Sequence, residues 1–336
     1  MRAMNILSID LEDYFMVTAL EGAVRREDWH RYESRIERST YRLLEILDCG
    51  FSTAELSNGG CSGIDGDSGR TGAIHATFFC LGWVGERYPH LIKEIQSRGH
   101  EIASHGYDHR LVSTMSRTEF REDIRRSKGV LEDLAGRGVM GYRAPSYSVT
   151  RETLWALDVL AREGFVYDSS IFPIHHDRYG LPGAPRTPFM VSGNGDGGWN
   201  PLPLGRRAGT GSRPSFDALE PLPDFLMEFP VSTLRIFGQN IPVAGGGYFR
   251  LFPICVTEFA MGRIKRESEA PFVFYMHPWE IDPGQPRIRG ISLKSRFRHY
   301  VNLGRTEARL KRLLGAVPFS SFRDYISTHL SDDDSC

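Results

Sequence analysis

The sequence predicts an α/β fold in which helices cover a parallel β-sheet, and three observations support this class. Short apolar runs alternate with helical patterns through most of the 336 residues. The connections between these runs are mostly short, as they are in repeated strand–helix units. Reactive polar residues directly follow five of the runs. Units on this scale commonly close into a barrel, although an open doubly wound sheet has the same local pattern.

The predicted strands are brief, apolar and separated by helix signals. They cover residues 5–9, 75–81, 100–104, 139–142, 165–167, 226–231 and 272–276. Helices are expected over Ser39 to Leu47, where the leucines have helical spacing, and from Pro89 to a stop at Gly99. The run Ser116-Arg117-Thr118-Glu119 has the form of a capping box before a helix that stops at Gly136, and Thr150 caps another that stops at Gly164.

The domain organisation follows from where this rhythm breaks. Segments near 55–73 and 192–217 are rich in Gly, Ser, Asp, Pro or Arg. Because strand–helix units continue on both sides, we interpret them as loop insertions in one catalytic barrel of residues 1–285. Residues 286–330 are expected to form a C-terminal helical extension packed on the barrel, and 331–336 a disordered tail.

Composition and charge exclude several classes of protein. Lys and Arg total 41 against 42 Asp and Glu, so no global charge favours nucleic-acid binding. No apolar run approaches the roughly 18 residues of a transmembrane segment, and the start lacks the pattern of a secretion signal. The five cysteines are scattered without a Cys-x-x-Cys pair, which argues against a disulfide framework. These features together indicate a cytoplasmic protein.

Polar residues at the ends of predicted strands indicate a catalytic site. Asp10, His105, Arg143, Asp168 and His277 each directly follow a different strand. In a parallel barrel the carboxyl ends of the strands meet on one face, where barrel active sites are built. The sequence therefore predicts that these five side chains converge.

Two histidines and an acidic run suggest a metal site at this face. His105 and His109 are four residues apart, so on a turn-like loop both imidazoles point the same way. A lone pair of this spacing is weak evidence, but the run Asp10-Leu11-Glu12-Asp13 follows another strand. Two histidines and one carboxylate suit zinc or another divalent Lewis acid, and a second carboxylate is free to accept a proton.

Several segments match the motifs of a known family. The chain resembles the polysaccharide deacetylases with a NodB homology domain, the carbohydrate esterase family 4, over roughly residues 4–280. The matching segments, in order, are Ser8-Ile9-Asp10-Leu11-Glu12-Asp13, Ser104-His105-Gly106-Tyr107-Asp108-His109, Arg143-Ala144-Pro145-Ser146-Tyr147, Asp168-Ser169-Ser170 and Tyr275-Met276-His277-Pro278.

The resemblance implies a distorted (β/α)7-type barrel and metal-dependent hydrolysis of N-acetyl groups on a sugar or polysaccharide. Such an enzyme is a hydrolase acting on linear amides, and its partner is an N-acetylated saccharide. It implies that Asp10 is the general base and Arg143 its partner. His277 is then the general acid, which Asp168 supports. The implied metal, Zn²⁺ with Co²⁺ or Ni²⁺ as alternatives, binds His105, His109 and a carboxylate of the first motif.

The first motif leaves the identity of that carboxylate open. Many family members have adjacent aspartates there, whereas this chain has Asp10-Leu11-Glu12-Asp13. Glu12 lies two residues beyond Asp10 and faces the same way on a strand, while Asp13 lies just past the strand end. Both Glu12 and Asp13 are therefore candidate metal ligands.

Further segments resemble one bacterial branch of the family, which is linked to exopolysaccharide synthesis and exosortase systems. They are Gly245-Gly246-Gly247-Tyr248-Phe249-Arg250, His277-Pro278-Trp279-Glu280 and Arg298-His299-Tyr300. This branch implies an exopolysaccharide-related substrate and an association with membrane-bound polysaccharide synthesis machinery. Two alternatives stay open: the same barrel acting on O-acetyl esters or small cyclic amides, and a catalytically silent carbohydrate-binding relative.

Overall fold

Seven parallel strands form the centre of the computed structural model, which describes residues 4–49, 72–176, 179–192, 201–203, 225–268 and 270–330. Their spatial order is β11-β1-β2-β3-β4-β5-β8. The strands are β1 (Asn5–Leu11), β2 (Thr77–Cys80), β3 (Glu101–Ser104), β4 (Gly141–Tyr142), β5 (Tyr167–Asp168), β8 (Phe225–Glu228) and β11 (Val273–Met276). Each lies in or overlaps one of the seven runs that the sequence predicts.

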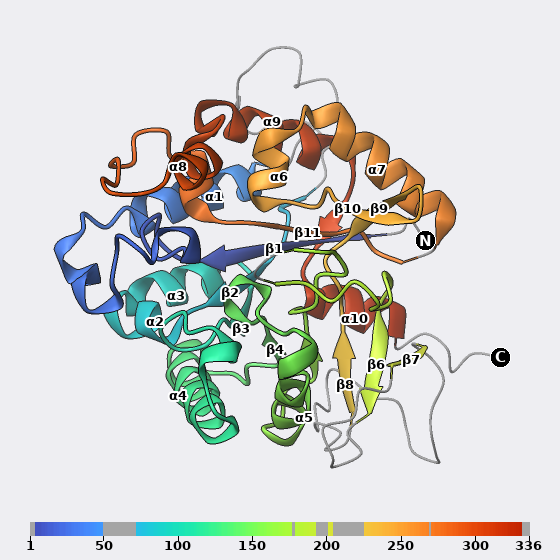
Figure 1. Ribbon diagram of the computed structural model, residues 1–336, viewed down its shortest axis with the longest axis horizontal. Helices are drawn as coiled ribbons and strands as arrows, with labels where there is room; N and C mark the ends of the chain where they lie inside the picture. The colour runs from blue at the N-terminus through green and yellow to red at the C-terminus, as the bar shows by residue number, and fades with distance from the viewer. Residues whose placement is uncertain are drawn as a thin grey trace.

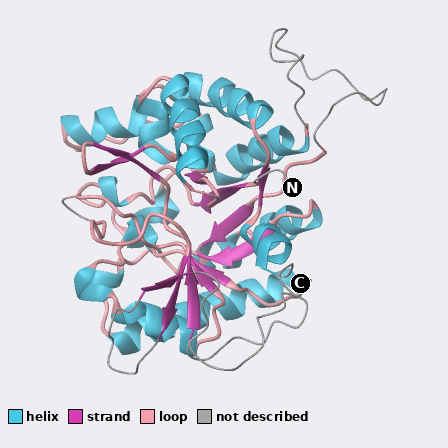
Figure 2. Ribbon diagram, turned by 90° about the vertical axis from the view of Figure 1, so that its right-hand side faces the viewer, coloured by secondary structure: helices cyan, strands magenta, loops and turns pink. Residues whose placement is uncertain are grey.

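Helices surround this sheet, and the strands converge at the centre of the molecule (Figures 1 and 2). The α-helices are α1 (Ile36–Asp48), α2 (Gly82–Arg87), α3 (Pro89–Ser97), α4 (Arg117–Ala135), α5 (Trp155–Arg162), α6 (Gly246–Leu251), α7 (Ile254–Glu267), α8 (Leu293–Tyr300), α9 (Leu303–Ala316) and α10 (Phe322–Leu330). The predicted capping box at Ser116 and Glu119 is present, and Gly136 ends α4 with a φ of 63°. None of the helices in the described ranges combines the length and apolar content needed to cross a membrane.

The barrel is distorted because the strands at the two ends of this spatial order, β11 and β8, are not joined by a β-ladder in the described residues. Instead Ser232, just after β8, connects the two ends. Its backbone N–H donates to the Val273 carbonyl at 3.4 Å, and its hydroxyl accepts the Val273 N–H at 2.9 Å. The predicted distorted (β/α)7-type architecture is confirmed, with this opening between β8 and β11.

The sequence did not predict the antiparallel additions to this frame. Strand β6 (Phe189–Ser192) pairs with β8 and with β7 (Pro201–Pro203). Strands β9 (Thr233–Ile236) and β10 (Gln239–Pro242) form a separate hairpin. A short strand near the C-terminus, β12 (Phe319–Ser320), pairs in parallel with β1. Residues 193–200 and 204–217 of the second predicted insertion lie outside the described residues, as do 55–71 of the first and the predicted tail 331–336.

A glycine run allows the chain to pass directly against β11. Gly245 has a φ of 122°, and a Cβ atom there would lie 1.9 Å from the carbonyl oxygen of Tyr275. Gly246, at a φ of 51°, similarly faces the Tyr275 ring. Only glycine tolerates this combination of backbone conformation and close approach. The run thereby places α6 beside β11, the strand directly followed by His277.

Candidate active site

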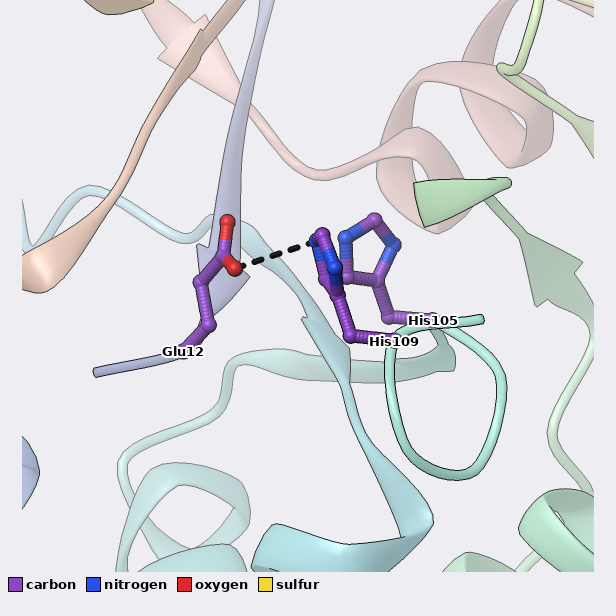
Figure 3. Close-up of side chains that lie close together, drawn as sticks. All are labelled: Glu12, His105 and His109. Carbon is purple, nitrogen blue, oxygen red and sulfur yellow. Dashed lines mark ion pairs between the residues drawn. The ribbon is translucent and has the colours of Figure 1, made fainter. Parts of the chain in front are cut away.

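Three side chains that could together hold a metal ion meet at the carboxyl ends of β1 and β3. Glu12 follows β1, while His105 directly follows β3 and His109 lies on the same loop (Figure 3). One ligand atom from each residue lies within 4.8 Å of the others. The His109 Nε2 atom is 3.2 Å from Glu12 Oε2. All three residues are at most 2 % exposed, so the cluster is a buried donor set.

The protonation states of this cluster suit a divalent cation. His105 Nδ1 donates to the carbonyl of Arg143 at 2.8 Å, which leaves the Nε2 lone pair free for a ligand. Burial lowers the pKa of His105 and brings that of His109 to about 4, so both rings are neutral at neutral pH. Burial alone would raise the pKa of Glu12, but His109 and His277 lower it to about 2. An ionised carboxylate and two neutral imidazoles are the donor states that zinc prefers.

Contacts around the histidine loop fix its shape. Arg26 donates to two successive carbonyls, from Nε to Asp108 at 2.9 Å and from Nη2 to His109 at 3.0 Å. His109 itself has a left-handed φ of 62°, a conformation that a non-glycine residue adopts only when its surroundings impose it. The Tyr107 N–H donates to Asp123 at 3.0 Å. These contacts hold the His109 ring beside that of His105, with the ring centres 5.6 Å apart and the planes at 67°.

The structure does not bring Asp13 to the imidazoles. Its Oδ2 accepts the Ser34 hydroxyl at 2.8 Å and the backbone N–H groups of Arg35 and Ile36 at 2.8 and 3.2 Å. Oδ1 accepts the N–H of Tyr14 at 2.9 Å. Asp13 therefore satisfies backbone donors at the start of α1, where carboxylates are favourable. Of the two open candidates, only Glu12 lies within the cluster.

Asp10 and Arg143 form a buried ion pair beside the cluster. Arg143 Nη1 donates to Asp10 Oδ1 at 2.7 Å and to the Ser8 hydroxyl at 2.9 Å. Its other nitrogens bond Ser169, Nε to the carbonyl at 3.1 Å and Nη2 to the hydroxyl at 3.0 Å. The guanidinium is completely buried and lies 4.1 Å from the centre of the Phe79 ring. One carboxylate oxygen of Asp10 is thus fixed, and Oδ2 lies 3.8 Å from His277 Nε2.

His277 lies between Asp10 and Glu280, with Nε2 toward Asp10 and Nδ1 toward Glu280. Its Nε2 is 2.9 Å from Glu12 Oε1, and its Nδ1 is 3.3 Å from Glu280 Oε2. Burial alone would lower the pKa of His277, but the carboxylates of Glu12 and Glu280 raise it to about 10. The ring also stacks on Trp279, at 5.2 Å and 24°.

Glu280 is in turn fixed by Arg250, which the sequence motifs did not single out as a site residue. Arg250 Nε donates to Glu280 Oε1 at 2.7 Å, and both side chains are at most 3 % exposed. Burial alone would raise the pKa of Glu280, but Arg250 and His277 lower it to about 2. Reasoning from sequence missed this partner, although the three-residue spacing in His277-Pro278-Trp279-Glu280 is that of a capping box.

The structure places Asp168 away from its expected partner. No ion pair joins Asp168 and His277, which are both described residues. Asp168 accepts the hydroxyl and the backbone N–H of Ser170 at 2.6 and 3.1 Å and shares a hydrogen bond with Glu228. Burial raises the pKa of Asp168, and burial together with the neighbouring Asp168 raises that of Glu228. This pair braces the junction of β5 and β8.

The site opens into a cavity of about 300 Å³. Its floor contains Asp10, Glu12, His105, His109 and His277. In the wall Ser146 has a left-handed φ of 52°, and its hydroxyl lies 2.6 Å from that of Thr18. The hydrogen bonds of this turn use the N–H groups of Tyr147 and Ser148 and leave that of Ser146 without an acceptor among the described residues.

Comparisons with known proteins identify two regions of the chain. Residues 70–164 match the family model described as polysaccharide deacetylase, and residues 200–327 match a domain of unknown function, DUF3473. The second region contains β11, His277, Glu280 and α8. The candidate site therefore combines residues of both matched regions: His105 and His109 lie in the first, and His277 and Glu280 lie in the second.

Curated relatives are similar to part of the chain. A peptidoglycan-N-acetylglucosamine deacetylase of Bacillus cereus is 33 % identical over 86 residues, which cover 25 % of this chain and 31 % of that protein. A peptidoglycan deacetylase of Helicobacter pylori is 31 % identical over 104 residues, or 31 % of this chain and 34 % of that protein. The chain thus spans about a third of the length of the curated relatives it matches.

Similarity of fold extends much further along the chain. A crystal structure of a protein assigned as a polysaccharide deacetylase from Mycobacterium smegmatis superposes with a TM-score of 0.51 at 19 % identity. That match covers 97 % of this chain and 90 % of the other. Residues 70–164 are therefore similar to the polysaccharide deacetylase family, residues 200–327 match DUF3473, and the chain as a whole shares the fold of this solved structure.

Proposed function

We propose that this protein hydrolyses N-acetyl groups on a saccharide with the help of a divalent metal held by Glu12, His105 and His109. The proposal depends on one observation. The buried donor set lies next to both Asp10 and His277. Zn²⁺ suits two imidazoles and a carboxylate best, with Co²⁺ and Ni²⁺ as alternatives. When bound, the cation would supply Lewis-acid polarisation of the acetamide carbonyl and of the attacking water.

The residues of the chain divide the proton transfers between them. Asp10 takes the proton of the attacking water, because Arg143 fixes one of its oxygens and leaves the other facing His277. His277 delivers a proton from Nε2 to the departing nitrogen, since an amine leaves poorly without one. The unpartnered N–H of Ser146 suits the carbonyl oxygen as negative charge develops on it.

Glu280, rather than Asp168, takes the supporting role behind His277. An imidazole that donates from Nδ1 presents Nε2 to the cavity, and Glu280 lies on the Nδ1 side. The Arg250 contact keeps Glu280 ionised and in place. We assign Asp168 to the bracing of the loop that carries Ser169, which in turn holds Arg143.

We also propose that the substrate is related to an exopolysaccharide. Support comes from the segments Gly245 to Arg250, His277 to Glu280 and Arg298 to Tyr300, which resemble an exopolysaccharide-linked branch of the family. All three lie within the residues matched to DUF3473.

Acetate release tests the proposed function. The purified protein, stripped of metal and then loaded separately with Zn²⁺, Co²⁺ or Ni²⁺, is incubated with N-acetylglucosamine oligomers, acetyl-xylan and allantoin. We expect acetate from the N-acetylated oligomers, and its loss together with bound metal in His105→Ala. Product from acetyl-xylan or allantoin alone would move the activity to esters or cyclic amides. Binding of the oligomers without acetate release would indicate a silent carbohydrate-binding relative.

A further inference from the structure

The cavity above the metal cluster continues into a longer cleft. A second hollow of about 550 Å³ adjoins it, and the two share lining residues from three segments. The shared residues are Thr18, Ala19, Leu111, Ser292 and Ser295. A cleft that extends beyond the reacting atoms has room for further sugar units. The residues that line it therefore help to determine which class of saccharide binds.

The two walls of this cleft differ in charge. One wall is the 3₁₀ helix η1 (Thr18–Leu20) with Glu21, and Arg26 lies 3.3 Å from that carboxylate. The other wall is α8, whose Lys294 and Arg298 line the cavity one helical turn apart. Neither cation has an ion-pair or hydrogen-bond partner in the described chain. The α8 wall therefore presents positive charge that none of the described residues neutralises through an ion pair.

Positive charge is concentrated in the segment that contains this wall. Residues 286–300 contain five cations and no Asp or Glu, although the whole chain has a net charge of only -1. The cations are Arg287, Arg289, Lys294, Arg296 and Arg298. Other exposed arginines are paired with carboxylates, for example Arg42 with Glu307 and Arg312 with Glu258. Positive charge concentrated along a cleft attracts anionic ligands and raises their local concentration.

The charged wall is fixed relative to the reacting atoms. Arg250 bonds Glu280 through Nε and the carbonyl of His299, near the end of α8, through Nη1 at 2.7 Å. His299 also stacks on Trp279 at 4.4 Å and 16°, and Trp279 stacks on His277. The helix that carries the two cations is thus tied to the general-acid side of the site.

From these observations we infer that the cleft takes an N-acetylated oligosaccharide that bears an anionic group, and that Lys294 and Arg298 bind this group. The inference rests on the proposed function and specifies its substrate class. A sugar carboxylate and a sugar-linked phosphate share the required chemistry, since both accept charge-assisted hydrogen bonds from lysine and arginine.

The test compares N-acetylated oligosaccharides of equal length that are neutral, carry a uronic acid or carry a phosphate ester. With the metal-loaded protein we expect kcat/KM for an anionic substrate to exceed that for the neutral one by about tenfold, the effect of about 1.4 kcal/mol. The stronger of the two anionic arms identifies the source of the charge. Added salt should reduce the preference, because the two cations are exposed.

Matched variants locate the effect. The double variant Lys294→Ala/Arg298→Ala should raise KM for the anionic substrate by about tenfold, leave kcat unchanged and spare the neutral substrate. Arg296→Ala is the control, because it removes an exposed cation of the same helix that does not line the cleft. Equal kcat/KM for neutral and anionic substrates, with no effect of the double variant, would overturn the inference and leave the proposed function standing.

Two further readouts separate the remaining outcomes. If no substrate releases acetate, the proposed function fails, and equilibrium binding of the anionic oligosaccharide to wild type and to the double variant still tests the inference. Leu293 and Phe297 on the same helix are 83 % and 59 % exposed, a feature that a membrane-binding surface would also show. Binding to anionic and to neutral phospholipid vesicles is therefore measured as well. Loss of anionic-vesicle binding in the double variant, with KM unchanged, would assign the cations to a membrane surface and contradict the inference.

Discussion

A single carboxylate oxygen of Glu280 contacts both the backbone and the ring of His277, accepting the N–H at 3.0 Å and lying 3.3 Å from Nδ1. The orientation of the ring therefore depends on a residue three positions further along the chain. Replacing Glu280 should disturb the general acid while leaving the three metal ligands in place.

We expect Glu280→Gln to lower kcat by about 10- to 100-fold with metal content and KM nearly unchanged, because a supporting hydrogen-bond partner has effects of this size. Steady-state kinetics and metal analysis of the same preparation measure both. Asp168→Asn is the matched control and should reduce kcat much less, since Asp168 contacts Ser170 and Glu228 instead. A larger loss of kcat in Asp168→Asn than in Glu280→Gln would restore Asp168 as the partner of His277.

The neighbouring carboxylates Glu12 and Asp13 should respond to substitution in opposite ways. Glu12→Gln is expected to lose metal affinity, because it removes the only carboxylate of the cluster. Asp13→Asn should retain metal but lower the free energy of unfolding by about 1–3 kcal/mol, since a buried acceptor of four donors is impaired. Metal titration and urea unfolding of both variants distinguish the roles. Metal loss in Asp13→Asn alone would exchange them.

Asp10→Asn should bind metal as the wild type does and lose most of its turnover. The amide cannot take a proton from water, and removal of a general base typically costs 10²- to 10⁴-fold in rate. Arg143 can still donate to the remaining amide oxygen, so we expect the fold to persist. Acetate release, metal content and circular dichroism are the measurements. An active Asp10→Asn protein would exclude Asp10 as the base.

His100 predicts a loss of stability in acid that is separate from the active site. It is 1 % exposed, its Nδ1 accepts the Ala76 N–H at 3.2 Å, and burial lowers its pKa from 6.5 to about 4. Because the folded pKa lies below the unfolded value, the stabilisation is complete above pH 6.5. It is lost as the pH falls toward 4, by about 3 kcal/mol for a shift of this size.

Urea unfolding of wild type and His100→Asn between pH 7 and pH 4 measures this contribution. The asparagine side chain can still accept the Ala76 N–H through its oxygen but does not titrate. Its free energy of unfolding should therefore fall less steeply in this window. Parallel pH profiles for the two proteins would show that His100 does not cause the acid sensitivity.

The sequence predicted the frame of the site better than its details. The period of the apolar runs located all seven parallel strands, and the residues after them placed Asp10, His105, Arg143 and His277 on one face. Local patterns suffice for this, because parallel strands align their carboxyl ends regardless of the loops between them.

Details that depend on tertiary contacts did not follow from the sequence. Spacing left Glu12 and Asp13 equivalent, and only the start of α1 at Ile36, more than 20 residues later, draws Asp13 away. Glu280 was overlooked because the family motif suggested Asp168 as the partner of His277. In the structure the His277 ring instead faces Glu280, which lies on the short 3₁₀ helix that directly follows it. The antiparallel strand β6 was missed because its pairing with β8 bridges a segment of weak pattern.

Strand β1 has consequences for how the protein is made. It lies between β2 on one side and β11 and β12 on the other, and those last partners are more than 260 residues away in sequence. During synthesis, one edge of β1 therefore stays unpaired until almost the entire polypeptide has left the ribosome. Shortened versions that begin with β1 and end before β11 should expose this edge and aggregate, so expression of residues 1–164 alone is a poor route to an active protein.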